Sequence, residues 1–249
     1  MTICYFSATG NSLYAARRIG GTLLSIPKLM RQESIEIEDD AVGIVSPVYV
    51  GGMPLMVQAF LKRADIKTDY FFCVLTCGNG GSFSQVQALA QSRSLPLQYG
   101  AIIRMADNFL PVFEMRQEIE NLPQKDVEGQ ISTVCRDIAS RVQNLTAEEK
   151  GRAHPFMNMF AKKVLRRDAA QGYIVNEQCI HCGICAKVCP ADNITVTGEN
   201  VIFSDRCEVC YACVHNCPQN AIHLRKERSA ARFRNEHVTL QDIIEANGS

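Results

Sequence analysis

The chain has 249 residues, of which 47% are hydrophobic, and 26 basic side chains balance 26 acidic ones, so its formal net charge is zero. This length and composition allow a buried core, and we expect two domains of unequal size. The charge balance gives no reason to expect nucleic acid or an anionic membrane as a partner, and no apolar run has the length of a membrane span.

The sequence contains 12 Cys residues. The chain does not open with a charged and then apolar export signal, so we expect free thiols in a reducing cytoplasm rather than a disulfide framework. Cys4 and Cys73 fall in expected strands, and Cys135 lies beside the apolar stripe of an expected helix. We expect these three to be small buried hydrophobic residues rather than reactive thiols.

The first apolar run, at residues 3–6, is followed directly by SATGNS at residues 7–12. Apolar residues then recur at helical spacing as far as Leu23, which predicts a strand, a tight loop and a helix. The loop has no Lys after its Gly, which excludes a Walker A motif. Its hydroxyls and the free N–H groups at the start of a helix can still hold a phosphate. A simply capped helix start is the alternative.

Three further strands are expected at residues 41–45, 70–75 and 97–105. Strand–loop–helix units in series predict a doubly wound parallel sheet, whose loops at the carboxyl ends of the strands meet at one ligand-binding rim. Each such loop, taken singly, is also explained as an ordinary turn. The loops at this rim are SPVYVGGMP at residues 46–54, TCGNGGS at residues 76–82 and ADNFLP at residues 106–111.

The loop at residues 7–12 resembles the phosphate loop of flavodoxins, and the next two rim loops coincide with those that enclose the flavin ring in that family. The resemblance spans roughly the first 110 residues and implies a flavodoxin-like sheet that binds FMN. Tyr49 is the expected stacking residue, because the chain has no Trp. The implied FMN site consists of Ser7, Thr9, Gly10, Asn11, Ser12, Pro47, Tyr49, Gly51, Thr76, Cys77, Gly78, Asn79 and Gly80.

Apolar residues spaced three and four apart from Val127 to Leu145 predict a last helix packed on the sheet, which completes an expected domain at residues 1–150. Residues 151–172 are expected to form a helical connector. Four basic residues near its end suit a solvated helix terminus or an acidic docking partner. They are Lys162, Lys163, Arg166 and Arg167.

Two runs of the form C-x2-C-x2-C-x3-C-P follow, CIHCGICAKVCP at residues 179–190 and CEVCYACVHNCP at residues 207–218. Iron–sulfur clusters are held by thiolates, and three Cys at this spacing can surround one cluster whose fourth ligand comes from elsewhere. A zinc ribbon uses paired C-x2-C motifs and does not explain the third Cys of both runs. The spacing therefore predicts two 4Fe–4S clusters.

The two runs resemble those of bacterial two-cluster ferredoxins, in which the fourth Cys of each run binds the other cluster. The resemblance implies one ligand set of Cys179, Cys182, Cys185 and Cys217, and a second set of Cys207, Cys210, Cys213 and Cys189.

Short strands are expected around the runs, so residues 173–224 should form a small α+β ferredoxin domain. Tyr173, Phe203 and Tyr211 are expected to shield the clusters from water, and His181 and His215 to lie outside the ligand sets. Residues 225–249 form a tail that either braces the two domains or recruits a partner.

The whole pattern resembles the flavodoxin–ferredoxin fusion proteins of anaerobic bacteria. The resemblance implies a cytoplasmic electron-transfer protein that passes single electrons between two 4Fe–4S clusters and FMN, and exchanges them with a redox partner protein. No catalytic residue is expected, because Ser7 and Ser12 lack a paired His and Asp. Two alternatives stay open. One is an FMN-dependent reductase of a small organic acceptor, with a pocket at Tyr49, Cys77 and Asn108, and the other is a flavin-free docking domain that carries a ferredoxin.

Overall fold

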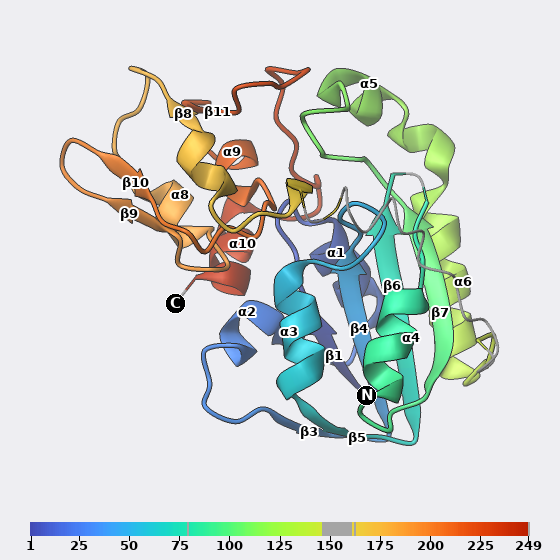
Figure 1. Ribbon diagram of the computed structural model, residues 1–249. Helices are drawn as coiled ribbons and strands as arrows, with labels where there is room; N and C mark the ends of the chain where they lie inside the picture. The colour runs from blue at the N-terminus through green and yellow to red at the C-terminus, as the bar shows by residue number, and fades with distance from the viewer. Residues whose placement is uncertain (79, 146–160, 162, 249) are drawn as a thin grey trace.

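A five-stranded sheet, in the order β2-β1-β4-β6-β7, forms the centre of the first half of the chain (Figure 1). All neighbouring strands in it are parallel. The three central strands are buried along almost their whole length, as expected when both faces of a parallel sheet are covered. The strands are β1 (Thr2–Tyr5), β2 (Thr22–Ser25), β4 (Ala41–Pro47), β6 (Tyr70–Cys77) and β7 (Leu97–Arg104).

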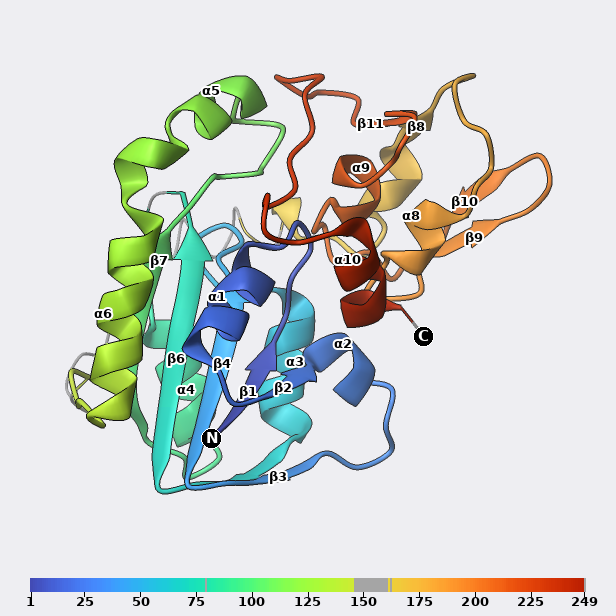
Figure 2. The same ribbon diagram turned by 180° about the vertical axis from the view of Figure 1, so that it is seen from behind.

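Helices cover both faces of this sheet. Helices α3 (Leu55–Arg63) and α4 (Ser84–Gln91) lie on the face turned to the viewer in Figure 1, and α1 (Asn11–Ile19) and α6 (Val127–Ala139) lie on the opposite face, seen in Figure 2. The remaining elements of this half are shorter. They are α2 (Ile26–Leu29), α5 (Met115–Glu120), the 3-10 turn η1 (Leu122–Lys125), and the parallel pair β3 (Glu36–Glu38) and β5 (Asp65–Lys67).

The first helix ends earlier than its apolar spacing predicts. Leu23 was expected on this helix, but α1 stops at Ile19 and Leu23 lies in the edge strand β2. The cause is the pair Gly20 and Gly21, whose positive φ angles of 89° and 92° end the helix and reverse the chain. Strand β2, which the spacing did not predict, pairs with β1 as a result.

Other expected boundaries also shift. Thr76 and Cys77 are expected in a loop but are the last residues of β6, and Ser46 and Pro47 likewise end β4. Helix α6 ends at Ala139 and Arg141 takes a left-handed φ of 50°, so Val142 and Leu145 lie beyond the helix. Val142 is nevertheless anchored, because its carbonyl oxygen accepts a hydrogen bond of 2.7 Å from the Tyr70 hydroxyl.

The second half of the chain contains the two Cys runs and only short elements. Strand β8 (Ile174–Val175) pairs antiparallel with β11 (Ile222–His223), and β9 (Ile194–Val196) forms a hairpin with β10 (Val201–Phe203). Helices α8 (Ile184–Lys187) and α9 (Ala212–His215) each carry the third Cys of a run. The 3-10 turn η2 (Ala169–Gly172) precedes these elements, and helix α10 (Leu240–Asn247) follows them.

Two hydrophobic clusters form the core, and each contains residues of both halves. The cluster that contains the sheet residues also includes Val188, Cys210 and Ala212 from the Cys runs and Val238 and Ile243 from the tail. The tail therefore braces the two halves, which was one of its two expected roles. The expected division at residues 1–150, 151–172, 173–224 and 225–249 stays a prediction.

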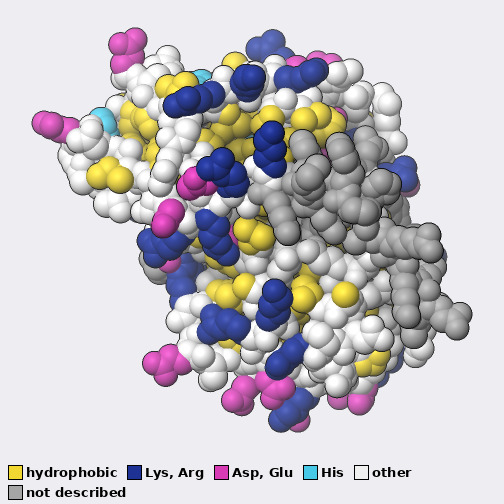
Figure 3. All heavy atoms as spheres, in the orientation of Figure 1, with side chains coloured by type: hydrophobic (Ala, Val, Ile, Leu, Met, Phe, Trp, Pro, Cys, Tyr) yellow, Lys and Arg dark blue, Asp and Glu magenta, His cyan; other side chains and the backbone are white. Residues whose placement is uncertain are grey.

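The computed structural model describes residues 1–78, 80–145, 161 and 163–248. Asn79, Lys162 and residues 151–160 of the expected helical connector lie outside the described residues. Within the described ranges, no helix is both long enough and apolar enough to cross a membrane. Basic and acidic side chains are interspersed on the face shown in Figure 3, in keeping with the zero net charge.

Of the three Cys residues expected to be buried hydrophobic groups, Cys4 and Cys73 are fully buried in the sheet. Burial raises the pKa of the Cys4 thiol to about 12, so it stays protonated at neutral pH. Cys135 differs, because it is only half-buried.

Candidate iron–sulfur centre and adjoining pocket

The two Cys runs repeat one backbone conformation. His181 and Val209, which precede the second Cys of each run, have φ angles of 52° and 54°. Gly183 and Tyr211, which follow that Cys, have φ angles of 76° and 57° and cap α8 and α9. Left-handed backbone is rare for residues other than Gly, so its recurrence at matching positions shows that each run winds around its own site in the same way.

The first site brings together Cys residues from both runs. Cys179, Cys182 and Cys185 line a small cavity with Cys217 of the second run, and Val196 and Ile222 are among the apolar residues that close it. Burial raises the pKa of the Cys185 thiol to about 11, and the nearby thiols of Cys217, Cys179 and Cys182 add to this effect.

The second site mirrors the first. Cys189 of the first run lies close enough to Cys207, Cys210 and Cys213 for its charge to raise their pKa values, although burial is the main cause of each shift. All four of these Cys residues are buried. Four thiols in a buried group suit a site for a metal cluster, which binds them as thiolates.

Backbone N–H groups point at several of these sulfur atoms. The N–H of Asn193 donates to Cys189 Sγ at 3.3 Å, and the N–H of Ala221 donates to Cys217 Sγ at the same distance. Each donor lies four residues after the last Cys of its run, so the repeat extends to this bond. Val209 N–H also donates to Cys207 Sγ at 3.2 Å. Such bonds stabilise thiolate charge and tune cluster potentials, so the geometry fits an iron–sulfur cluster at each site.

Among the described residues, no three His, Cys, Asp or Glu side chains converge tightly enough to hold a single metal ion. This result is compatible with a cubane cluster, whose four thiolates bind four separate iron atoms and so stand farther apart than the ligands of one ion.

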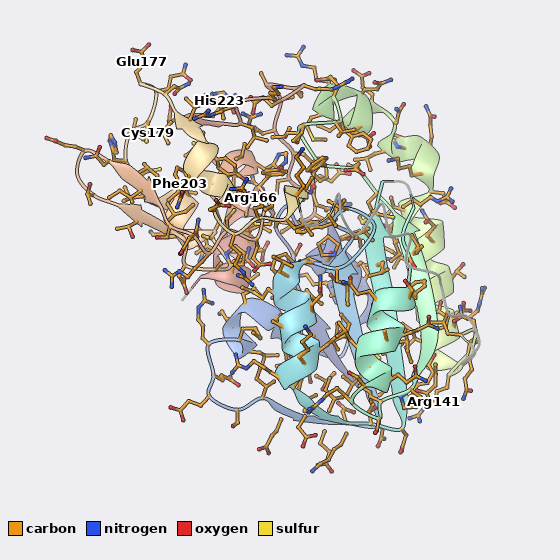
Figure 4. The ribbon with its side chains drawn as sticks, in the orientation of Figure 1. Arg141, Arg166, Glu177, Cys179, Phe203 and His223 are labelled. Atoms are coloured by element: carbon orange, nitrogen blue, oxygen red, sulfur yellow. The ribbon has the colours of Figure 1, made fainter. Side chains whose placement is uncertain are left out.

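The two sites differ in their exposure to solvent. Cys182 is exposed and Cys179 is half-buried, whereas the second set is buried. Figure 4 shows Cys179 on the outer side of the Cys-rich part, away from the sheet. The first set therefore faces outward, and the second set faces the sheet.

The expected shielding aromatic residues gather at the second site. The ring of Tyr173 lies 5.7 Å from that of Phe203 and 6.2 Å from that of Tyr211, measured between centroids. Its hydroxyl lies 4.0 Å from Cys207 Sγ. Phe109, from the loop after β7, packs on Tyr211 at 5.9 Å and joins this aromatic group to the sheet.

A narrow cavity, which we call the rim cavity, opens at the carboxyl ends of the sheet strands. Ser7 is almost fully buried there, and its hydroxyl has no hydrogen-bond partner among the described residues. The Ser12 and Thr76 hydroxyls share a hydrogen bond of 2.8 Å, and Asn108 Nδ2 donates to Thr9 Oγ1 at 2.6 Å. The lining residues are Ser7, Ala8, Thr9, Asn11, Ser12, Pro47, Val48, Tyr49, Thr76, Cys77, Gly78, Ala106, Asp107 and Asn108.

A second cavity of about 290 Å³, which we call the ring cavity, adjoins the rim cavity. The two share the residues Val48, Tyr49, Cys77, Asp107 and Asn108. The far wall of the ring cavity is formed by Val209, Cys210 and Tyr211 of the second Cys run, together with Phe109, Val112, Phe113 and Leu165. The two cavities therefore adjoin, and their walls together extend from the loop at residues 7–12 to the second Cys set.

Most residues of the implied FMN site line these cavities. Gly51 lines the ring cavity, and Gly10, with φ of 99°, caps α1 without lining either space. Gly80 lines neither cavity, and Asn79 is outside the described residues. Asp107 lines both cavities but is not predicted from the sequence, because the loop ADNFLP carries no phosphate or flavin motif.

Glu208 is a second residue that the sequence does not predict. It lies between two expected cluster ligands, yet its side chain is fully buried. One carboxylate oxygen accepts the N–H of Met56 at 2.8 Å, at the start of α3, and the other pairs with Arg167 at 2.9 Å. Burial raises the pKa of this carboxyl, while the Met56 and Arg167 contacts oppose the rise. Of the basic residues expected in the connector, Arg167 thus binds an acidic group within the chain, and Arg166 pairs with Asp168.

His215 connects the same two halves. Its Nδ1 atom accepts the N–H of Phe233 at 3.1 Å, so the ring proton must lie on Nε2, which donates to the Asn108 carbonyl at 3.0 Å. Burial lowers the pKa of His215 to about 4, which keeps the ring neutral at physiological pH. The imidazole therefore serves as a structural link between the rim, the Cys-rich part and the tail.

Comparison with known proteins identifies the Cys-rich part. A family model described as a 4Fe-4S dicluster domain matches residues 171–218. Polyferredoxin protein MvhB of Methanothermus fervidus is 38% identical over 71 residues, which make up 28% of this chain and 15% of that protein. The protein of the same name from Methanothermobacter thermautotrophicus is 48% identical over 52 residues, or 20% of this chain and 13% of the relative.

A component of the ion-translocating oxidoreductase complex of Methanosarcina acetivorans is 50% identical over 48 residues, 19% of this chain and 18% of that protein. The matches thus span less than a fifth of each of these relatives. Residues 171–218 are a 4Fe–4S dicluster domain of the ferredoxin type, and this part of the chain serves iron–sulfur electron transfer.

Proposed function

We propose that this chain is a cytoplasmic electron-transfer protein in which two 4Fe–4S clusters exchange single electrons with an FMN bound at the sheet rim, and with a redox partner protein. The observation that carries the proposal is the pair of adjoining cavities whose walls extend from the rim loops to the second Cys set. When bound, FMN can exchange one or two electrons, whereas each cluster exchanges one.

The strand order supports the flavin site. Numbered within the sheet, it reads 2-1-3-4-5, the order in which flavodoxin-like sheets bind FMN between the first and third strands. Here those strands are β1 and β4, which the loops at residues 7–12 and 46–54 follow. The buried Ser7 hydroxyl, which has no partner in the part of the chain that the structure describes, supplies a donor where an FMN phosphate would lie.

The ring cavity supplies the surroundings that an isoalloxazine ring requires. Tyr49 packs edge-on against Phe6 with ring centroids 6.3 Å apart, which fixes its ring at the cavity wall. Cys77 and Gly78 offer backbone groups at the carboxyl end of β6. Val112, Phe113 and Leu165 supply apolar surface on the far side.

For the clusters we propose the crossed ligand sets. Cys179, Cys182, Cys185 and Cys217 would hold one cluster, and Cys207, Cys210, Cys213 and Cys189 the other. The shared cavity of the first set and the mutual pKa effects within the second set support this division.

The same contacts support an order of electron transfer. The buried second set adjoins the ring cavity through Cys210, so we propose that its cluster faces the flavin. The first set includes the exposed Cys182, so its cluster would meet the partner protein. Glu208 and His215 tie the second run to the sheet and hold this arrangement in place.

The proposal is tested by the cofactor content of protein purified and reconstituted without oxygen. Acid release should give about one FMN per chain, with about eight iron and eight sulfide. Full iron with no flavin would reject the flavin site and leave a ferredoxin with a docking domain. No more than about four iron per chain after reconstitution would reject the two-cluster assignment.

A reductase of a small organic acceptor is the second candidate, favoured by the apolar walls of the ring cavity. Steady reduction of quinones, enones or nitroaromatic compounds by the reconstituted protein, without any acceptor protein, would favour this function. A rate no greater than that of free FMN would reject it.

A further inference from the structure

We propose that three asparagines, Asn216, Asn235 and Asn247, hold the loop at residues 7–12 in the shape that binds a phosphate. They lie in the Cys-rich part and the tail, so phosphate binding at the sheet would depend on both. The inference rests on the proposed FMN site and names positioning residues for it that no rim motif contains.

Three consecutive carbonyl oxygens of the loop are occupied by these asparagines. Figure 2 shows the tail passing the N-terminal end of α1, where the contacts form. The Ser7 oxygen accepts from Asn247 Nδ2 at 2.9 Å, the Ala8 oxygen from Asn216 Nδ2 at 3.2 Å, and the Thr9 oxygen from the backbone N–H of Asn235 at 2.8 Å.

These carbonyl bonds determine where the loop N–H groups point. In a planar trans peptide the C=O and the following N–H point in opposite directions. With the oxygens of residues 7–9 turned to the asparagines, the N–H groups of residues 8–10 face the other way. Among the described residues, none of these N–H groups has an acceptor. Successive N–H groups of this kind form an anion-binding concavity.

A second observation points to a ligand on that side of the loop. The Ser7 hydroxyl is buried, with 2% exposure, and lacks a partner among the described residues, and Ser7 lines the rim cavity. Free N–H groups and an unpaired buried hydroxyl on the same short loop match the oxygens of a phosphate group.

Each side-chain contact also reaches a Cys run. Asn247 Nδ2 donates a second bond of 3.2 Å to the carbonyl of Val188, the residue before Cys189. Asn216 Nδ2 donates a second bond of 2.9 Å to the carbonyl of Ala212, the residue before Cys213. The exposed fractions of Asn216 and Asn247 are 3% and 0%, so water cannot replace these bonds.

The tail packs on the loop too tightly for any residue but Gly at position 10. A Cβ on Gly10 would lie 2.9 Å from Val238 Cβ and 3.0 Å from Asn235 Cβ, and its φ of 99° is also one that Gly favours. Asn235 Nδ2 donates to Asn11 Oδ1 at 3.2 Å, which fixes the side chain at the start of α1. The tail is therefore a built-in support of the loop.

The test compares FMN with riboflavin, which carries the same ring without the phosphate. Asn216→Ala and Asn247→Ala should each weaken FMN binding about tenfold or more and change riboflavin binding less than about twofold. Equal weakening of both ligands, or no change in either, would overturn the proposal. Asn144→Ala is the control, because Asn144 bonds Gly100 at 2.9 Å through both amide atoms in a different part of the sheet.

Iron content and circular dichroism establish that the variants are folded. Should both of these variants misfold, Asn235→Ala serves instead, because it removes the Asn11 contact but keeps the backbone bond to Thr9. It should weaken FMN binding a few-fold more than riboflavin binding, and an equal effect on both would count against the proposal.

Inorganic phosphate separates this proposal from the proposed function. If the wild type binds no FMN, the flavin function fails. Inorganic phosphate should then still bind the wild-type protein, and this binding should broaden the ³¹P signal of the phosphate. Asn247→Ala should not broaden that signal. Equal broadening with both proteins, or none with the wild type, would reject the asparagine support as well.

Discussion

Asn108 donates a hydrogen bond of 2.6 Å to the hydroxyl oxygen of Thr9, and thereby joins the loop after β7 to the loop after β1. The carbonyl of Asn108 in turn accepts from His215 of the second Cys run. Because the Thr9 oxygen already accepts a bond, its own proton is free to be donated into the rim cavity that Thr9 lines.

Thr9→Val should therefore weaken FMN binding about tenfold to a hundredfold, the usual effect of losing one hydrogen bond to a charged group. Iron and sulfide content should not change, and riboflavin binding should change little. Fluorescence titration of the anaerobic protein measures both ligands, with Thr22→Val as a control on the edge strand. Unchanged FMN binding would show that this loop does not hold the phosphate.

Cys189→Ala should remove the cluster of the second set, although Cys189 belongs to the first run. Iron should fall from about eight to about four per chain. Cys182→Ala should remove the other cluster, so the electron paramagnetic resonance signal that remains in Cys189→Ala should be absent from Cys182→Ala. Cys135→Ala is a matched control, because this half-buried thiol lies in α6, away from both sets. Loss of the same signal in Cys189→Ala and Cys182→Ala would disprove the crossed ligation.

Glu208→Ala should destabilise the folded protein, because it leaves the Met56 N–H and the Arg167 guanidinium without their buried partner. We expect the free energy of unfolding to fall by roughly 2–4 kcal/mol. Glu208→Gln, which keeps an acceptor for Met56, should lose less. Anaerobic urea denaturation followed by circular dichroism gives these values. If both variants match the exposed-site control Glu199→Ala, Glu208 is not a tie between the halves.

Asp107→Asn should strengthen FMN binding at neutral pH. Burial raises the pKa of the Asp107 carboxyl, so this carboxyl binds a proton more readily in the folded protein than in the unfolded chain. The free energy of unfolding therefore falls as the pH rises through the raised pKa. The charged form also repels a phosphate in the rim cavity that Asp107 lines. The Asn variant keeps an oxygen for the Phe109 N–H and loses the charge.

The gain from Asp107→Asn should shrink as the pH falls through the raised pKa of this carboxyl, because the wild-type side chain then becomes neutral. Dissociation constants for FMN, measured from neutral pH down through the titration of this carboxyl, test this behaviour. A gain that is independent of pH over this range would mean that the charge of Asp107 is not its cause.

The sequence could predict where the Cys runs and the rim loops lie, because both depend on local patterns. Three Cys at intervals of three lie within a single loop, and a second copy of the run marks the second Cys group. A strand followed by SATGNS and a helical spacing similarly places the first loop at the end of β1.

The elements that the sequence missed depend on distant contacts or on single residues. In the sequence, nothing distinguishes Glu208 from a charged surface residue. Its hydrogen-bond partner Met56 lies 152 residues away along the chain. Asn247 meets Ser7 across 240 residues, so no local pattern could show that the tail folds back. Leu23 continued the helical spacing by coincidence, and only the left-handed Gly20 and Gly21 separate it from α1.

Gly183 and Tyr211 occupy matching positions but differ in what they add to each Cys run. Tyr211 accepts a left-handed φ of 57°, whereas Gly183 adopts its φ of 76° without strain, and Tyr211 also forms part of the ring-cavity wall. An aromatic residue at this position thus marks the inward half, and in a relative with the two residues exchanged we would expect the domain to be docked the other way round.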